Sequence, residues 1–289
     1  FDMKADSVQN LIGETLSSFI KEAIGQDGSQ ARVLPAMDSL AMAKIYNPAQ
    51  LLIINTRNLT ASTAQKVSFN QPFAVEVVVK NLGSEPVENV SLLLTPDVVD
   101  GVTINKSTLA IPGIIAGDDT GKVVFSLTAL PRVGRVNLTA GIVGSKGLNE
   151  GHAAAVQTAG QVNSTFADIE TNARLEILRV FTSVEDINAG DNTSNWRINV
   201  EVLNAGQSAL ALTEVNSSNI IIRTDGIVDG NYKITPVSLV RAGGFTLPGG
   251  SSSDTLYYVV TKNGDLAGQA EITVRLQGYD VNLGTPTPQ

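Results

Sequence analysis

The chain has 289 residues, which is long for one small domain and suits two. Its 20 Lys and Arg against 28 Asp and Glu give a net charge of −8 without a basic cluster, so nucleic acids and anionic membrane surfaces are not expected partners. The absence of cysteine excludes thiolate nucleophiles, disulfides and cysteine-bound metals. The single histidine, His152, is flanked by Gly and Ala and is expected in a solvated loop. A hydrolase that uses two carboxylates stays formally open, but no acid pair stands out, and we predict no catalytic residue.

The first 50 residues are expected to form an N-terminal helix and a linker. Apolar side chains recur at helical spacing over residues 7–24, Ser7 can cap this helix, and Gly25 ends it. Its apolar stripe needs a partner on the same chain, on a neighbouring domain or on another subunit. The first six residues lack the features of a signal peptide, so we expect either a signal that has been removed or a piece of a longer protein. No apolar run approaches the ~18 residues of a membrane helix, and no membrane span is expected.

From about residue 51 onward the sequence predicts one strand after another. Residues 73–80 show the period-2 pattern of a sheet with one buried face. Further strands are expected at 51–54, 90–94, 102–104, 123–127 and 136–142, and in the second half at 175–180, 196–203, 220–223, 256–260 and 271–276. Short strands separated by Gly, Pro, Asp and Asn favour β-sandwiches, and the missing helical periodicity disfavours a parallel α/β fold.

The two halves are copies of each other. The motif Val77-x-Val79-x-Asn81-x-Gly83 returns 123 residues later as Val200-x-Val202-x-Asn204-x-Gly206. Pro-Gly pairs at 112–113 and 248–249 are offset by 136, and a Gly-x-x-x-(Leu/Ile)-Thr motif at 134–139 returns at 268–273. Because the offset rises in mid-domain, the second copy should carry extra residues, in 211–219 and 224–232.

These repeats divide the chain into modules. We expect a first sandwich over residues 51–165 and a second over 166–284, with the boundary in the polar stretch at 163–172. The last residues, 285–289, are a Pro/Thr tail of the kind that often leads to a next domain.

The repeated motifs have a structural explanation. Asn tolerates positive φ and bonds to its own turn, glycine supplies a second unusual dihedral angle, and Pro-Gly sets a tight turn before a strand. We therefore predict that the Asn-x-Gly segments at 81–83 and 204–206 shape turns. None of the glycine spacings forms a phosphate loop, so no nucleotide cofactor is expected.

Taken together, the strand–Asn-x-Gly turn, the Pro-Gly turn and the Gly-x-x-x-(Leu/Ile)-Thr strand resemble bacterial and archaeal immunoglobulin-like modules of the CARDB type (cell-adhesion-related domain found in bacteria). The resemblance covers about residues 51–151 and 173–284. It implies an all-β fold of two tandem immunoglobulin-like sandwiches in an extracellular or cell-surface protein. It also implies a non-catalytic structural or adhesion role, with no catalytic residues to carry over. The alternative is a carbohydrate-binding or accessory module of a larger secreted hydrolase.

Two acidic loops offer oxygen ligands for calcium. The first contains Asp186, Asn188 and Asp191, and the second contains Asp225 and Asp229. Neither loop has EF-hand spacing, and turns rich in Asp, Asn and Gly also arise in β-proteins for backbone reasons. Calcium is therefore a hypothesis for these loops, and no other metal or cofactor is expected.

Two features of the sequence concern glycans, one as modifications and one as ligands. Acceptor motifs Asn-x-Ser/Thr occur at seven positions, Asn58, Asn89, Asn105, Asn137, Asn163, Asn192 and Asn216. In a secreted eukaryotic or archaeal protein these would carry glycans on surface loops, whereas in most bacteria they would be inert. A sugar-binding platform would need exposed aromatic residues, but Trp196 lies in an apolar strand and is expected in the core or between domains.

The N-terminal segment also suggests a mode of assembly. The extended stretch at 29–56 could add a strand to the open edge of a sandwich, either that of its own chain or that of a neighbour. The helix and this segment either fold back on the first sandwich or connect copies, or neighbouring domains of a longer chain, into filaments or surface arrays. Under the second hypothesis, deleting residues 1–50 leaves both sandwiches folded and abolishes the oligomer.

Overall fold

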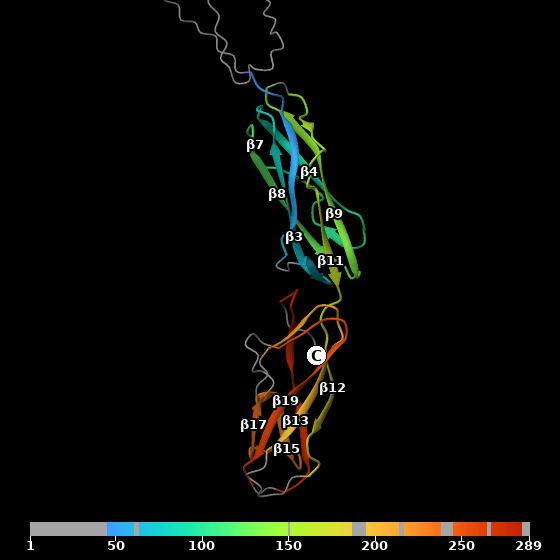
Figure 1. Ribbon diagram of the computed structural model, residues 1–289, viewed down its shortest axis with the longest axis vertical. Coiled ribbons are helices and arrows are strands. Elements are labelled where there is room, and N and C mark those ends of the chain that lie inside the picture. Colours follow the sequence, from blue (N-terminus) through green and yellow to red (C-terminus); the bar gives the residue numbers. More distant parts are fainter. Residues whose placement is uncertain are drawn as a thin grey trace, which may run out of the picture.

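The computed structural model describes residues 45–60, 64–149, 151–186, 195–213, 217–237, 245–264 and 267–284. These residues form two β-sandwiches that follow each other along the long axis of the molecule (Figure 1). The helix expected at 7–24, the linker up to residue 44 and the tail at 285–289 lie outside the described residues. Within the described ranges, no helix combines the length and the apolar character that a membrane crossing requires.

The first sandwich consists of two sheets. One sheet has the order β10–β1–β3–β8–β5, with bounds β1 (Gln50–Asn58), β3 (Pro72–Asn81), β5 (Val102–Ile104), β8 (Thr120–Ala129) and β10 (Ala155–Val156). The other has the order β2–β11–β9–β4–β6, with β7 also beside β4, and consists of β2 (Lys66–Ser68), β4 (Val87–Pro96), β6 (Thr108–Ala110), β7 (Ile114–Ile115), β9 (Gly134–Gly147) and β11 (Ser164–Glu170).

Alternating side chains build the first core between these sheets. In β3, Val75, Val77 and Val79 point inward and are fully buried. Leu138 of β9 and Ile169 of β11 face them from the other sheet. Burial of several β-branched and leucine side chains, each worth about 1.5–3 kcal/mol, stabilises the packing of the two sheets.

The second sandwich repeats this plan, but one of its two layers is divided into two small sheets. Its largest sheet has the order β12–β13–β19–β17, with bounds β12 (Leu175–Thr182), β13 (Asn195–Asn204), β17 (Tyr232–Pro236) and β19 (Ser252–Lys262). Two three-stranded sheets oppose it, one of β14 (Leu210–Thr213), β18 (Phe245–Leu247) and β21 (Gln277–Asp280), the other of β15 (Ile220–Thr224), β16 (Ile227–Val228) and β20 (Ala270–Val274). A 3-10 turn at Ser217–Asn219 precedes β15.

The strand registers show which elements correspond. β1 and β3 match β12 and β13, and both first strands have a bulge at the same place, after Ile53 and after Ile177. In the first sandwich Val87 of β4 lies opposite Gly147 of β9, and in the second Leu210 lies opposite Asp280. One continuous strand, β4, therefore corresponds to the separate strands β14 and β15 of the second copy.

The registers also correct the predicted alignment of the Pro-Gly pairs. β18 pairs with β14 as β7 pairs with β4, so Leu247 corresponds to Ile115. The next residues agree, because Cβ atoms built on Gly117 and Gly249 would meet the carbonyl oxygens of Ser84 and Gln207. Pro248-Gly249 thus matches residues 116–117, and the alignment with Pro112-Gly113 was wrong.

The boundary between the sandwiches lies at residues 171–174. β11 pairs with β9 and β2, so it belongs to the first sandwich up to Glu170, and β12 starts at Leu175. The expected division at 165/166 falls inside β11. Only four residues therefore connect the two sandwiches.

Candidate functional site

The end of the second sandwich that faces the first contains a buried carboxylate, Asp280, the last residue of β21. Its side chain is 1% exposed. Asp280 Oδ2 accepts a hydrogen bond of 2.7 Å from the backbone N–H of Ala173, and Oδ1 accepts one of 2.8 Å from the hydroxyl of Ser208. The hydroxyl of Ser68, in β2 of the first sandwich, lies 3.0 Å from each oxygen of the carboxylate. One side chain thus joins both sandwiches and the segment between them.

Further polar contacts surround Asp280. The side-chain amide of Gln71 donates to the backbone carbonyl of Asn282 at 2.8 Å, and Asn282 Nδ2 approaches Glu170 Oε2 at 3.3 Å. The connecting segment is bonded as well, since Thr171 and Gln207 exchange two backbone–side-chain hydrogen bonds. Buried, charge-assisted hydrogen bonds are directional and among the stronger polar contacts. They fix the relative orientation of the sandwiches more firmly than a four-residue connection alone would.

The first sandwich has a buried carboxylate in the same role, but at another position. Glu85 Oε2 accepts from the N–H of Ala49 at 3.3 Å, as Asp280 does from that of Ala173, and Glu85 Oε1 accepts from that of Asn149. A Cβ on Gly147, the counterpart of Asp280, would lie 2.6 Å from this carboxylate. Space for one carboxylate therefore exists in each sandwich, and Glu85 or Asp280 fills it.

The repeated Asn-x-Gly motif supports this end of each sandwich. Asn81 Nδ2 donates to the carbonyls of Glu85 and Ala116 at 2.7 and 3.3 Å, and Oδ1 accepts from the N–H groups of Gly83 and Gln50 at 3.1 and 3.3 Å. Asn204 makes the corresponding four bonds, at 2.8, 3.1, 3.1 and 3.2 Å. Both asparagines are completely buried.

The structural role of this motif and the bond of each asparagine to its own turn were predicted, but the expected positive φ values were wrong. Neither Asn81 nor Gly83 has a positive φ. Glycine is required because a Cβ would lie 2.1 Å from the carbonyl oxygen of Pro48 at Gly83, and 2.0 Å from that of Asn172 at Gly206. The motif therefore joins the end of β3 to the start of β1 through close backbone approach and a buried amide.

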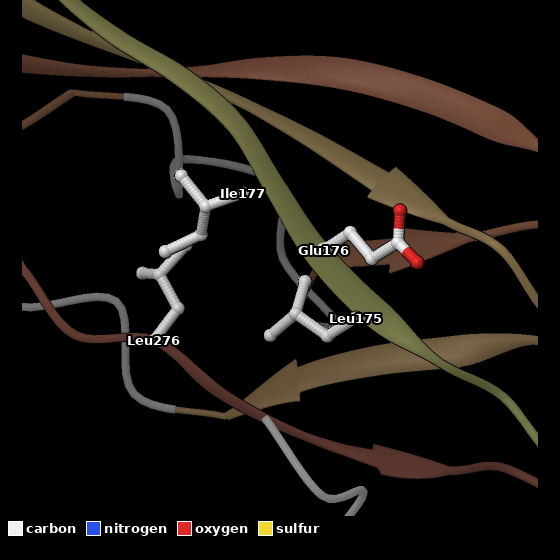
Figure 2. A pocket seen from close by; sticks show the side chains of 4 residues that line it. All are labelled: Leu175, Glu176, Ile177 and Leu276. Carbon is white, nitrogen blue, oxygen red and sulfur yellow. The ribbon is translucent and has the colours of Figure 1, made fainter.

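The side of the second sandwich opens into an apolar pocket of about 410 Å³. Leu175, Glu176 and Ile177 of β12 line it together with Leu276, which lies between β20 and β21. Figure 2 shows Ile177 and Leu276 pointing toward one another across this pocket. Beyond it, β12 exposes Leu178, Val180 and Phe181 by 37–49%. Such a run of exposed apolar side chains on an edge strand is typical of a surface that receives another chain segment.

The two loops that were considered for calcium differ in what the structure shows of them. Asn188 and Asp191 lie outside the described residues, and Asp186 is exposed. In the second loop Asp229 accepts hydrogen bonds from the Thr224 hydroxyl and the Asn231 N–H, and these bonds lower the pKa of the Asp229 carboxyl. Among the described residues no three His, Cys, Asp or Glu side chains gather around a point that could hold a metal ion.

The asparagines of the glycan acceptor motifs differ in hydrogen bonding and exposure. Asn58 Nδ2 donates to the carbonyl of Phe166 at 3.1 Å, and Asn137 Nδ2 donates to Asp97 at 2.6 Å. Asn89 and Asn105 are exposed. The remaining motifs are Asn163, which is half-buried, and Asn192 and Asn216, which lie outside the described residues.

The predicted positions of Trp196 and His152 are confirmed. Trp196 is 4% exposed in the second core, with its ring edge-to-face against Tyr232 at 6.3 Å between centroids. It therefore cannot serve as an exposed sugar platform. His152 is exposed in the loop between β9 and β10.

Comparison with known proteins gives distant structural likenesses. No family model matches the chain, and a search of curated proteins found no match. The Escherichia coli adhesin FdeC is 11% identical, over 82% of this chain and 64% of its own, with a TM-score of 0.35. Domains 5–6 of the S-layer protein SbsC are 12% identical, over 80% of this chain and 97% of their own, with a TM-score of 0.23. The adhesin InvE of Yersinia pseudotuberculosis is 14% identical, over 78% of this chain and 59% of its own, with a TM-score of 0.25.

This chain spans less than two thirds of the FdeC chain. The fold itself follows from the strand pairing described above, which gives two all-β immunoglobulin-like sandwiches. The CARDB type stays a prediction.

Proposed function

We propose that this chain is a non-catalytic structural protein of the cell surface or extracellular space, in which immunoglobulin-like modules in series act as a stiff spacer or adhesion stalk. The observation that carries the proposal is the junction at Asp280, whose carboxylate bonds to both sandwiches and to the connecting segment. A flexible pair of binding modules needs no such link, whereas a spacer that holds a distance does. The end-to-end arrangement in Figure 1 fits the same role.

The stiffness of the junction can be measured directly because the chain has no cysteine. Cysteines introduced as Lys106→Cys and Ile227→Cys, both at exposed positions, carry one spin label on each sandwich. We expect a narrow distance distribution, and a clearly broader one after Asp280→Ala. Asp254→Ala, which removes an exposed carboxylate of β19, is the matched control and should leave the width unchanged. A broad distribution in the unmodified protein would contradict the stiff-spacer role.

The alternative function, a carbohydrate-binding or accessory module of a secreted hydrolase, loses its best candidate because Trp196 is buried. Tyr257, 41% exposed on β19, is an aromatic residue that such a module could still use. Incubation with a panel of glycans and glycosides separates the functions. Binding without turnover would favour the alternative, turnover would favour an enzyme, and neither is expected for the structural role.

A further inference from the structure

The first sandwich is closed by residues that follow β9. β10 pairs in parallel with the edge of β1, and the N–H groups of Gln157 and Val162 donate to the carbonyls of Leu51 and Ile53 at 2.9 Å each. β11 then runs between β9 and β2, with Ala167 and Ile169 buried in the core. Under this cover Ile53 has no exposed surface.

The second sandwich has the same surfaces without this cover. Among the described residues, no strand pairs with the outer edges of β12 or β20. Ile177, the counterpart of Ile53, is 38% exposed, and Val180 is 37% exposed where its counterpart Thr56 is 5% exposed. On the opposing sheet Ile272 is half-buried, whereas its counterpart Leu138 is fully buried. The groove between β12 and β20 therefore corresponds to the place that β11 fills in the first sandwich.

The free edge of β12 also presents acceptors. The carbonyl of Arg174 faces β13 and accepts from Ala205, as the carbonyl of Gln50 faces β3 and accepts from Leu82. Because backbone carbonyls alternate in direction along a strand, those of Leu175 and the residues in step with it face outward. In the first sandwich β1 offers the corresponding acceptors to residues 155–162, which precede β11 in the chain, whereas β11 itself pairs with β9 and β2.

The sequence contains a second copy of the closing strand, ahead of β1. At a constant offset of 124, five residues of the segment from 43 to 53 are identical to their counterparts from 167 to 177, namely Ala43 to Ala167, Ile45 to Ile169, Ala49 to Ala173, Leu51 to Leu175 and Ile53 to Ile177. Residues 41–45 thus repeat the inward pattern of β11. The first sandwich already holds its own β11, so this second copy has no place there.

Charge supports the match between this segment and the groove. In the first sandwich Asp168 of β11 lies opposite Arg135 of β9, and the two side chains form an ion pair at 2.8 Å. The counterpart of Asp168 is Lys44, and the counterpart of Arg135 is Gln269, two residues before Glu271. Gln269 and Glu271 line a hollow of about 520 Å³ together with Asp225. A cation at position 44 would therefore meet an acidic surface.

We propose that residues 40–46 of one copy complete the second sandwich of another copy, in the register of β11, so that copies join head to tail. This proposal extends the structural role proposed above from one chain to an array. The described chain begins at residue 45, and its first segment, blue in Figure 1, enters the first sandwich at the end farthest from the second. A strand inserted into the neighbour's groove therefore leads directly into β1, as β11 leads into β12. Such a heterologous contact repeats from copy to copy and gives a filament when the rotation between copies does not close a ring.

The register makes a precise test possible in a cysteine-free chain. β11 places Ala167 opposite residue 136 of β9, so the proposal places Ala43 opposite Ala270. Opposed residues of antiparallel strands have Cβ atoms about 4.5–5.5 Å apart, within reach of a disulfide after a small shift. Two full-length chains of different size, one with Ala43→Cys and one with Ala270→Cys, are mixed and oxidised. We expect a disulfide between the two chains.

The control is Lys44→Cys in place of Ala43→Cys, which moves the thiol to the other face of the strand and should cross-link far less. The double variant Ala43→Cys/Ala270→Cys on one chain should give a ladder of oligomers. Lys44→Glu should weaken assembly at low salt, as measured by light scattering, and Glu271→Lys should restore it. A disulfide confined to single chains, equal cross-linking at positions 43 and 44, or no cross-link at all would each overturn the proposal. The spin-label measurement within one chain is independent of these outcomes, so the array can fail while the stiff spacer stands.

Discussion

Replacing Asn81 by Asp tests the buried hydrogen bonds of this side chain at the end of the first sandwich. Asp keeps the acceptor for the N–H groups of Gly83 and Gln50, but it turns the amide that donates to Glu85 O and Ala116 O into an oxygen facing two carbonyl oxygens. Each lost hydrogen bond contributes about 0.5–1.5 kcal/mol, and each buried group left unsatisfied adds about 1–3 kcal/mol. Two bonds are lost and the introduced oxygen is left without a donor, so we expect Asn81→Asp to reduce the free energy of unfolding of the first sandwich by about 2–6 kcal/mol.

Urea unfolding with two probes locates the effect. The chain has one tryptophan, Trp196, in the core of the second sandwich, so its fluorescence follows that sandwich while circular dichroism follows both. Asn81→Asp should lower the urea midpoint of a dichroism transition and lower the fluorescence midpoint much less. Asn204→Asp should lower both midpoints. The control is Asn89→Asp, at an exposed position with φ of 55°. If Asn81→Asp changed the urea midpoint as little as Asn89→Asp, the asparagine would serve only the local turn, and the stabilising role of its buried hydrogen bonds would be refuted.

Two further substitutions probe the cores and the pH dependence. The hydroxyl of Tyr258 is buried without a hydrogen-bond partner among the described residues, and burial raises its pKa. Its counterpart in the first sandwich is Phe125, which has no hydroxyl. We therefore expect Tyr258→Phe to stabilise the second sandwich by about 1 kcal/mol or more, seen as a higher urea midpoint by fluorescence. The hydrogen bond from Lys122 is the main cause that lowers the pKa of Glu76 below its ordinary value of 4.5, so this carboxylate stabilises the fold at neutral pH and loses that effect as pH falls through the lowered pKa. Glu76→Gln should therefore reduce stability at pH 7 and flatten its dependence on pH below about 4.5; an unchanged acid slope would refute the role of this group.

The strands that the sequence predicts are those with strong side-chain alternation. The spacing of two between Val75, Val77 and Val79 fits a strand and no other element, and the corresponding run in β13 is just as clear. β11 lies in the polar stretch where the sequence predicts the domain boundary, and it was missed because two of its three inward positions are Thr165 and Ala167, which carry little hydrophobic signal. A comparison of residues 165–177 with 41–53 could have revealed it, since repetition is visible even where hydrophobicity is weak.

The stretch at 29–56 was predicted to add a strand to the edge of its own sandwich or of a neighbour's, and the structure answers this for its last part. β1 (Gln50–Asn58) lies between β10 and β3 of its own sandwich, so residues 51–55 are not available to a neighbour. Pattern alone could not separate the two parts of this stretch, because both are short and apolar. The contacts of Asn81 escaped prediction for a related reason. Its partners Gln50 and Ala116 are 31 and 35 residues away in the sequence, and only the folded chain brings them together.

The buried carboxylate shows how a repeated module can acquire a junction. The amide before the first strand of each sandwich needs an acceptor, and either residue 85 or its opposite neighbour 147 can supply one, but not both, because the space holds a single side chain. In the second sandwich the carboxylate comes from the later position, Asp280, while the earlier one is Ser208. This exchange keeps the internal hydrogen bonds and brings the carboxylate within 3.0 Å of Ser68 on the other sandwich. The link between modules therefore arises from moving one charge across a strand pair, without any added residue at the boundary.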